Sequence, residues 1–224
     1  MSKKGLLNKK VNLSDKFLSK LPLTYWGILK SMVGNDFKTI LDVGCGNGDP
    51  MAIINSEKKF MATGVDIYEP YLKKCKSRKI YKKLIRADVR KMPFEENEFD
   101  VVVSFHVLEH LTKKEGKIML KKMESIAKKR VVIALPHGHL PQEEFDGNTH
   151  QEHISEWYPK ELRRMGYKVV GQGLLAIYGN ANVVEKFGIF SNLIFALSLL
   201  SQPLLIVKPE MARYLICRKN LDEK

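Results

Sequence analysis

Three glycines stand at every second position in the stretch LDVGCGNGDP, residues 41–50, which directly follows a hydrophobic run. Glycine has no side chain and tolerates positive φ, so a ligand can touch the main chain of such a loop. Asp42 and Asp49 flank the glycines and would repel a phosphate group. The stretch therefore predicts a binding loop for a ligand that carries a positive charge and no phosphate.

Two common nucleotide-binding motifs do not fit this loop. The dinucleotide motif G-x-G-x-x-G would need its third glycine at position 49 or 51, which hold Asp49 and Met51. A P-loop would need a Gly-Lys-Ser or Gly-Lys-Thr sequence after the glycines, and none follows. An adenosine compound with a positive charge, such as S-adenosylmethionine, fits these residues better.

The motif Asp42-x-Gly44-x-Gly46-x-Gly48 resembles the first motif of the class I S-adenosylmethionine-dependent methyltransferases. Further segments match that family in order: GVDI ends the second predicted strand and carries Asp66, 18 residues after Gly48, and RADVRKMPFEENEFDVVVSFHVLEHL follows. The resemblance is close over residues 37–135 and rests on topology alone elsewhere. It implies S-adenosylmethionine as the cofactor and S-adenosylhomocysteine as its product.

The resemblance also implies roles for individual residues. Asp66 would accept hydrogen bonds from both ribose hydroxyls, Asp88 and Val89 would meet the adenine, and Phe105 would line the cofactor pocket. The full set of implied cofactor-binding residues is Asp42, Gly44, Cys45, Gly46, Gly48, Asp66, Ile67, Asp88, Val89 and Phe105. Each also has a plain structural interpretation, since a glycine turn can be a tight corner and an aspartate can cap a helix or close a turn. Their positions at the ends of three successive predicted strands favour the binding site.

Methyl transfer from a sulfonium needs alignment and the exclusion of water, and neither a metal nor a covalent nucleophile is obligatory. A base is needed only if the acceptor atom is a protonated oxygen or nitrogen. His106, directly after the predicted strand at 99–105, is the candidate base, and the alternative is a wall of the cofactor pocket. We interpret Glu109 and His110 as packing and capping residues at a helix start.

The loop PHGHLPQEEFDGNTHQEHISEW, from residue 136, holds four of the six histidines. We expect His137, His150, His153 and Trp157 to shape the acceptor pocket, because the loop follows a strand at the same sheet edge as the cofactor motifs. His150 and His153 could share one face of a helix and bind a metal. Their spacing fits no established zinc pattern, so we expect no metal.

Two missing motifs narrow the range of possible methyl acceptors. The Asn-Pro-Pro-Tyr type motif of exocyclic-amine methyltransferases is replaced by Ser104-Phe105-His106-Val107, and no Pro-Cys pair could serve a cytosine C5 enzyme. Both a small molecule and an RNA ribose stay open.

The elements that must position these residues alternate along the chain. Strand-like runs at 39–43, 60–67, 83–89, 99–105 and 130–135 are separated by helix-like segments at 50–58, 70–78 and 113–127. This alternation predicts an α/β fold with a doubly wound, mostly parallel sheet. A helix at 159–165 and strands at 167–179 and 211–219 complete seven strands, of which the last is expected to run antiparallel.

We expect a single domain with five parts. Residues 1–36 supply N-terminal helices, 37–135 form the cofactor-binding core, and 136–182 carry the acceptor-side loop, helix and strand. Residues 183–208 are an apolar insertion, and 209–224 hold the last strand and tail.

The insertion contains FGIFSNLIFALSLLSQPLLIV, residues 187–207, which has no charged residue. Its uncharged polar residues fall on one side of a helical wheel, and Pro203 would end or kink the helix. We expect an apolar helix that caps the acceptor pocket or lies in a membrane interface. The alternatives are a helix in the core or a dimer interface and, third, a transmembrane helix.

The composition sets the remaining expectations. The chain has 224 residues, a formal net charge of +13 and three cysteines without a CxxC pair. Few unpaired cysteines suit a reducing compartment, and no signal peptide is evident, so we expect a cytoplasmic protein, peripheral at the inner face of the membrane if the insertion binds lipid. We favour a small or amphiphilic acceptor, such as a lipid or lipid-linked glycan; the alternatives are an RNA methyltransferase and a non-catalytic S-adenosylmethionine-binding protein. The oligomeric state stays open.

Overall fold

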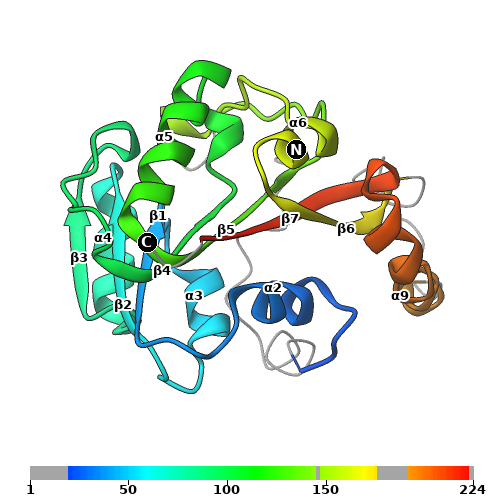
Figure 1. Ribbon diagram of the computed structural model, residues 1–224, viewed down its shortest axis with the longest axis horizontal. Helices are drawn as coiled ribbons and strands as arrows, with labels where there is room; N and C mark the ends of the chain where they lie inside the picture. The colour runs from blue at the N-terminus through cyan, green and yellow to red at the C-terminus, as the bar shows by residue number, and fades with distance from the viewer. Residues whose placement is uncertain (1–19, 145–146, 176–190, 222–224) are drawn as a thin grey trace.

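The computed structural model describes residues 20–144, 147–175 and 191–221, and Figure 1 shows their arrangement. A seven-stranded sheet in the order β3-β2-β1-β4-β5-β7-β6 forms the centre of the molecule. Every neighbouring pair is parallel except β5–β7 and β7–β6, because β7 runs antiparallel to both of its neighbours. The predicted fold class is therefore confirmed. The strands are β1 Thr39–Val43, β2 Met61–Asp66, β3 Lys83–Arg86, β4 Phe99–Phe105, β5 Ala127–Pro136, β6 Lys168–Leu174 and β7 Ala212–Asn220.

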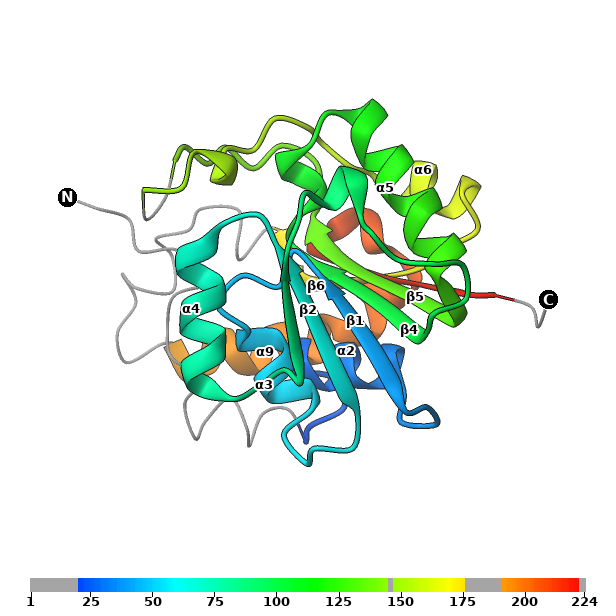
Figure 2. The same cartoon turned by 90° about the vertical axis from the view of Figure 1, so that its left-hand side faces the viewer.

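Helices cover both faces of this sheet, and they create two separate cores. Helices α5 (Lys113–Ile126) and α6 (Pro159–Arg164) lie over one face, whereas α2 (Tyr25–Val33) and α3 (Asp49–Ile54) lie over the other (Figure 1). Helix α4 (Glu69–Arg78) packs beside β2 and β3 (Figure 2). The sequence of α5 starts with a capping box, in which Thr112 and Glu115 bind each other's backbone amides.

The strand ends differ from the prediction where local hydrogen bonding takes over. Strand β3 ends at Arg86 and not at residue 89, because Asp88 accepts a hydrogen bond from the Arg90 amide and starts the short 3-10 helix η2 (Val89–Lys91). Strand β5 begins at Ala127, earlier than expected, since α5 passes into it without a loop. The predicted strand at 167–179 is observed as β6 up to Leu174, and residues 176–179 lie outside the described part.

Helix α9 (Ser191–Val207) runs along β6 at the edge of the sheet (Figure 1), with Ser198 and Gln202 turned inward. Ser198 is 5% exposed and Gln202 is 1% exposed, and the Gln202 side-chain amide donates to the Gly171 carbonyl at 2.6 Å. Leu200 and Val207, by contrast, are 76% and 72% exposed. Within the described ranges, no helix has the length and apolar character that crossing a membrane requires.

The predicted division of the chain into five parts stays a prediction. Helix α2 lies in the N-terminal part, while the expected helical residues up to 19 are outside the described part. Residues 187–190 of the apolar insertion are outside it as well.

Candidate cofactor and acceptor site

The glycine loop connects β1 to α3 at the carboxyl edge of the sheet, and all three glycines have positive φ. A Cβ atom on Gly44 would lie 2.4 Å from a methyl carbon of Val107, so this position has no room for a side chain. A Cβ atom on Gly46 would meet nothing within 4 Å. Gly44 is therefore required by packing, whereas the main chain at Gly46 is open to a ligand.

Asp66, the last residue of β2, is joined to this loop. Its carboxylate accepts hydrogen bonds from the amides of Gly46 and Tyr68, each at 2.8 Å, and Asp66 as a whole is 8% exposed. Burial raises the pKa of Asp66, and the two amide hydrogen bonds oppose that shift. The acid is thus fixed at the loop, where the resemblance places the ribose-binding group.

Two further acids lie beside the loop. Asp42 is 2% exposed and accepts a 2.6 Å hydrogen bond from the Tyr81 hydroxyl, and burial raises its pKa to about 7. Asp49, at the start of α3, pairs with Arg78 at 2.6 Å. Asp42 is thus a buried acid bound by Tyr81, and Asp49 is neutralised by Arg78.

Asp88 caps a short helix, which is the structural alternative to adenine binding. Its carboxylate caps η2 and binds the Arg90 guanidinium through two oxygens, at 2.9 and 2.6 Å. The hydrogen bonds from Arg90 lower the pKa of Asp88. Val89 is buried beside it, so of this pair only the Asp88 oxygens remain near the surface.

The other implied cofactor residues are held by packing or through the main chain. The Cys45 amide donates to the Val65 carbonyl at 3.0 Å. Ile67 follows Asp66, and its carbonyl accepts from Arg86 at 3.3 Å. Phe105 is 6% exposed and packs in the core under α2 and α3, so most of its ring faces the protein interior.

His106 is the centre of a polar group at the end of β4. Its φ of 57° is unusual for a residue with a side chain, and its amide donates to the Ala134 carbonyl at 2.7 Å. The ring nitrogen Nε2 lies 3.1 Å from the Tyr25 hydroxyl, and Nδ1 lies 3.3 Å from Oε1 of Glu109. The Tyr214 ring meets the His106 ring edge-on, with centroids 5.7 Å apart. Burial raises the pKa of Tyr25, so its phenol stays protonated and acts as a donor toward His106.

Glu109 was interpreted from the sequence as a packing or capping residue, and its setting is more unusual. The residue is 2% exposed, and neither carboxylate oxygen has an aligned hydrogen-bond partner among the described residues. Burial raises the pKa of Glu109, but contacts with His106 and His110 outweigh burial and the net direction is downward. In the sequence, the signal for this setting was the adjacent acid and histidine in HVLEHL.

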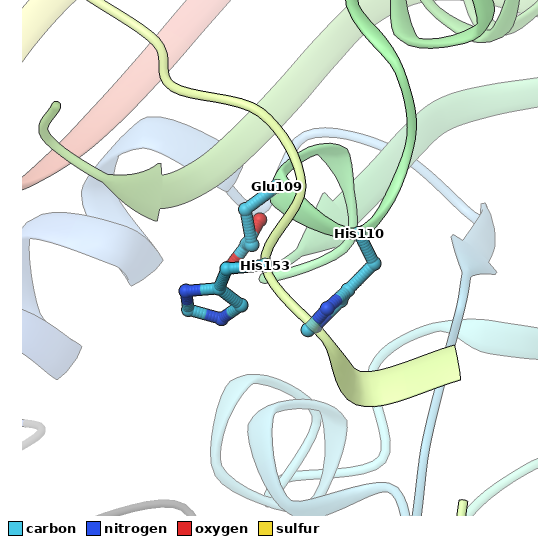
Figure 3. Close-up of side chains that lie close together, drawn as sticks. All are labelled: Glu109, His110 and His153. Atoms are coloured by element: carbon cyan, nitrogen blue, oxygen red, sulfur yellow. The ribbon is translucent and has the colours of Figure 1, made fainter. Parts of the chain in front are cut away.

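The histidines expected to shape an acceptor pocket fall into different places. His137 binds the Ala212 carbonyl through Nδ1 at 2.8 Å. His150 is exposed, near enough to Asp66 to lower the pKa of that acid. His153 lies with His110 and Glu109 (Figure 3), not on a shared helical face with His150.

Trp157 was expected in the acceptor pocket, and the structure corrects this prediction. Its side chain is 1% exposed and packs in the core against α5, where a Cβ atom on Gly116 would lie 2.6 Å from the indole. The indole nitrogen donates to the Ser155 hydroxyl at 3.0 Å. Trp157 therefore anchors the loop and cannot line an open pocket.

The sheet order, the glycine loop and the acid at the end of β2 agree with the resemblance to the class I S-adenosylmethionine-dependent methyltransferases. Residues 41–135 match the family model described as "Methyltransferase domain". This match covers less than half of the chain and agrees, over that part, with the resemblance drawn from the glycine loop. S-adenosylmethionine is the cofactor of this class, and the space beside Gly46, next to the carboxylate of Asp66, fits an adenosine compound.

Individual relatives match parts of the chain. An uncharacterized protein of Methanocaldococcus jannaschii is 29% identical over 117 residues, which are 52% of this chain and 49% of that protein. The 27-O-demethylrifamycin SV methyltransferase of Amycolatopsis mediterranei is 32% identical over 79 residues, 32% of this chain and 29% of that one. This chain thus spans half or less of the length of these two relatives. A solved S-adenosylmethionine-dependent methyltransferase of Archaeoglobus fulgidus shares the fold, with a TM-score of 0.59, 18% identity and coverage of 92% and 94% of the two chains.

Proposed function

We propose that the protein transfers the methyl group of S-adenosylmethionine to an oxygen or nitrogen of a small or amphiphilic acceptor, such as a lipid or lipid-linked glycan. The cofactor would bind with its ribose at Asp66 and its main-chain contacts at Gly46. The acceptor would approach the end of β4, where His106 lies. The observation that supports an amphiphilic acceptor is the orientation of α9, which buries two polar side chains against the sheet and exposes a leucine-rich face to solvent.

His106 is the group that would take the acceptor proton. Glu109 beside Nδ1 favours a protonated Nδ1, which leaves the Nε2 lone pair facing Tyr25. An acceptor hydroxyl or amine that replaces the Tyr25 hydroxyl would pass its proton to Nε2 as its lone pair attacks the methyl carbon. The bound cofactor would supply the methyl group, and the electron pair of its carbon–sulfur bond would stay on the sulfur of S-adenosylhomocysteine.

The exposed face of α9 supports an amphiphilic acceptor. It consists of five residues that are 41% to 76% exposed, namely Leu197, Leu200, Leu204, Ile206 and Val207. The end of α9 leads through the short helix η6 (Pro209–Met211) into β7, where the Ala212 carbonyl binds His137 and the Tyr214 ring meets His106. An acyl chain lying along α9 would thus end close to the proposed base, and α9 would hold the protein peripherally on a membrane.

RNA is the second candidate acceptor, because the net charge is +13. The uncharged face of α9 would contribute nothing to binding a phosphate backbone, whereas it suits a hydrocarbon chain. A protein that binds S-adenosylmethionine without catalysis is the third candidate. The polar group of Tyr25, His106 and Glu109 favours an enzyme over such a binding protein.

Liposome flotation at low and high salt tests the acceptor class. We expect the protein to float with anionic liposomes and to stay bound at high salt, because apolar insertion persists when charges are screened. A variant in which Leu200 and Val207 are replaced by glutamine should float only at low salt. If the intact protein bound tRNA tightly and no liposome at any salt, the acceptor would be RNA.

A further inference from the structure

We propose that Glu109, His110 and His153 form a binding site for a divalent transition-metal ion, such as Zn²⁺, Co²⁺ or Mn²⁺. One donor atom from each of the three residues lies within 4.8 Å of the others. Figure 3 shows the three side chains drawn together from two segments, since Glu109 and His110 belong to the short helix η3 (Leu108–His110) and His153 belongs to the loop after β5. This proposal departs from our expectation, drawn from the sequence, that no metal binds.

The two imidazoles are oriented for metal binding by the backbone. Nδ1 of His110 lies 3.0 Å from the Glu152 carbonyl, and Nδ1 of His153 lies 2.5 Å from the Leu140 carbonyl. A carbonyl oxygen can only accept, so in each ring Nδ1 carries the proton and Nε2 keeps its lone pair. Metal-binding histidines commonly have this arrangement, because a hydrogen bond at one nitrogen fixes the ring and its tautomer.

The carboxylate of Glu109 supplies the second, independent observation. Its side chain is 3% exposed, and neither oxygen has an aligned hydrogen-bond partner among the described residues. A buried carboxylate without hydrogen bonds is unfavourable unless a cation compensates its charge. Nδ1 of His106 lies 3.3 Å from Oε1. A bound divalent ion would satisfy the acid and explain why it is buried there.

The ligand set indicates the class of ion. Two imidazoles and one carboxylate suit zinc and neighbouring transition metals better than Ca²⁺ or Mg²⁺, which prefer oxygen ligands. Ligand atoms about 2.1 Å from a tetrahedral ion are roughly 3.4 Å apart. The three donor atoms lie within 4.8 Å of one another, so small side-chain rotations would bring them to this separation. Three protein ligands leave at least one position open, as in catalytic metal sites.

The location beside His106 suggests what the open position binds. Glu109 contacts the proposed base and also contributes to the cluster, so an ion there would lie next to the acceptor. Resting on the proposed function, we infer that the acceptor carries a hydroxyl oxygen that binds the ion and is thereby held beside His106. This would make an oxygen, and not a nitrogen, the methylated atom.

Metal binding is measured on the full chain without cofactor. The protein is treated with chelator and titrated with Co²⁺, which is followed by its visible absorption, and with Zn²⁺ in competition. We expect one ion per chain and an increase of the melting temperature. Glu109→Gln, His110→Ala and His153→Ala should each weaken binding by more than the 10- to 100-fold that is typical for the loss of a supporting hydrogen bond.

His139→Ala is the matched control, since His139 lies in the same loop, is exposed and pairs with Glu156 outside the cluster. It should bind Co²⁺ like the wild type. Binding of S-adenosylmethionine, measured separately by calorimetry, should be unchanged in His153→Ala, which separates failure of the metal site from failure of the cofactor site. No bound ion in the wild type, or equal affinity in the control and in the three variants, would overturn the metal site.

Discussion

The amide of Gly46 donates a 2.8 Å hydrogen bond to the carboxylate of Asp66, 20 positions further along the chain. This bond joins the glycine loop after β1 to the acid at the end of β2, so the two halves of the cofactor site are fixed to each other before a ligand arrives. Preorganisation of this kind lowers the entropy that binding must lose.

Replacing Asp66 should remove both this hydrogen bond and the proposed contact with the ribose. We expect Asp66→Ala to weaken binding of S-adenosylmethionine by at least about 2 kcal/mol, near the value for hydrogen bonds to a charged group. Calorimetry measures it directly. Nicotinamide and flavin dinucleotides should not bind the wild type, and tighter binding of a dinucleotide than of S-adenosylmethionine would contradict the cofactor assignment.

Gly44 and Gly46 form a matched pair, because both have positive φ but only one has space for a side chain. Gly46→Ala should cost roughly 1–2 kcal/mol of stability from the backbone conformation alone. It should also weaken binding of the cofactor, since the new methyl group would enter the open side of the loop. Gly44→Ala should cost about 3 kcal/mol or more, because the clash with Val107 adds to the backbone term. Urea unfolding of both variants checks the order, and equal losses would show that Val107 yields.

The buried carboxyl of Asp42 predicts a pH-dependent stability. Its pKa rises from 3.8 to about 7 on folding, so between these values the folded state holds more protons and stability falls as the pH rises. Asp42→Asn keeps an acceptor for Tyr81 and removes this effect. The stability gained by the variant over the wild type should grow by about 2–3 kcal/mol between pH 5 and pH 8. Urea unfolding at both pH values measures it, and a difference that stays constant would mean that Asp42 ionises normally.

Replacement of His106 tests the proposed base. His106→Gln should lower kcat by roughly 10²- to 10⁴-fold, the usual contribution of general base catalysis, with little change in the affinity for S-adenosylmethionine. Tyr25→Phe removes the hydroxyl at 3.1 Å from Nε2 but leaves the base in place, so its effect on kcat should be much smaller. Similar kcat values for His106→Gln and the wild type would make His106 a wall of the pocket.

The strands of the core were predictable because their apolar runs are bounded by clear signals. Strand β4 was predicted at its observed bounds, since the acid-rich segment before Phe99 and the turn at His106 limit a continuous apolar run. Strand β3 was predicted too long, because the cap that Asp88 provides depends on Arg90, whose side chain also pairs with Glu115 of α5.

The site was less predictable where it depends on contacts between distant segments. Trp157 belongs to the core because Gly116, 41 positions earlier, leaves room for its indole. Nothing in the local pattern around Trp157 shows this. Likewise, the pairing of His110 with His153 depends on the loop after β5 returning to η3, where the Ile154 and Ser155 amides bind the Glu109 carbonyl.

We propose that this chain moves a methyl group from S-adenosylmethionine to an amphiphilic acceptor. The most direct measurement is incubation with methyl-labelled S-adenosylmethionine and an extract of the source organism, followed by separation of the lipid, RNA and aqueous fractions. We predict label in the lipid-soluble fraction, lost in Asp66→Ala and strongly reduced in His106→Gln. Label in RNA alone, or no transfer to any fraction while the cofactor binds, would contradict the claim.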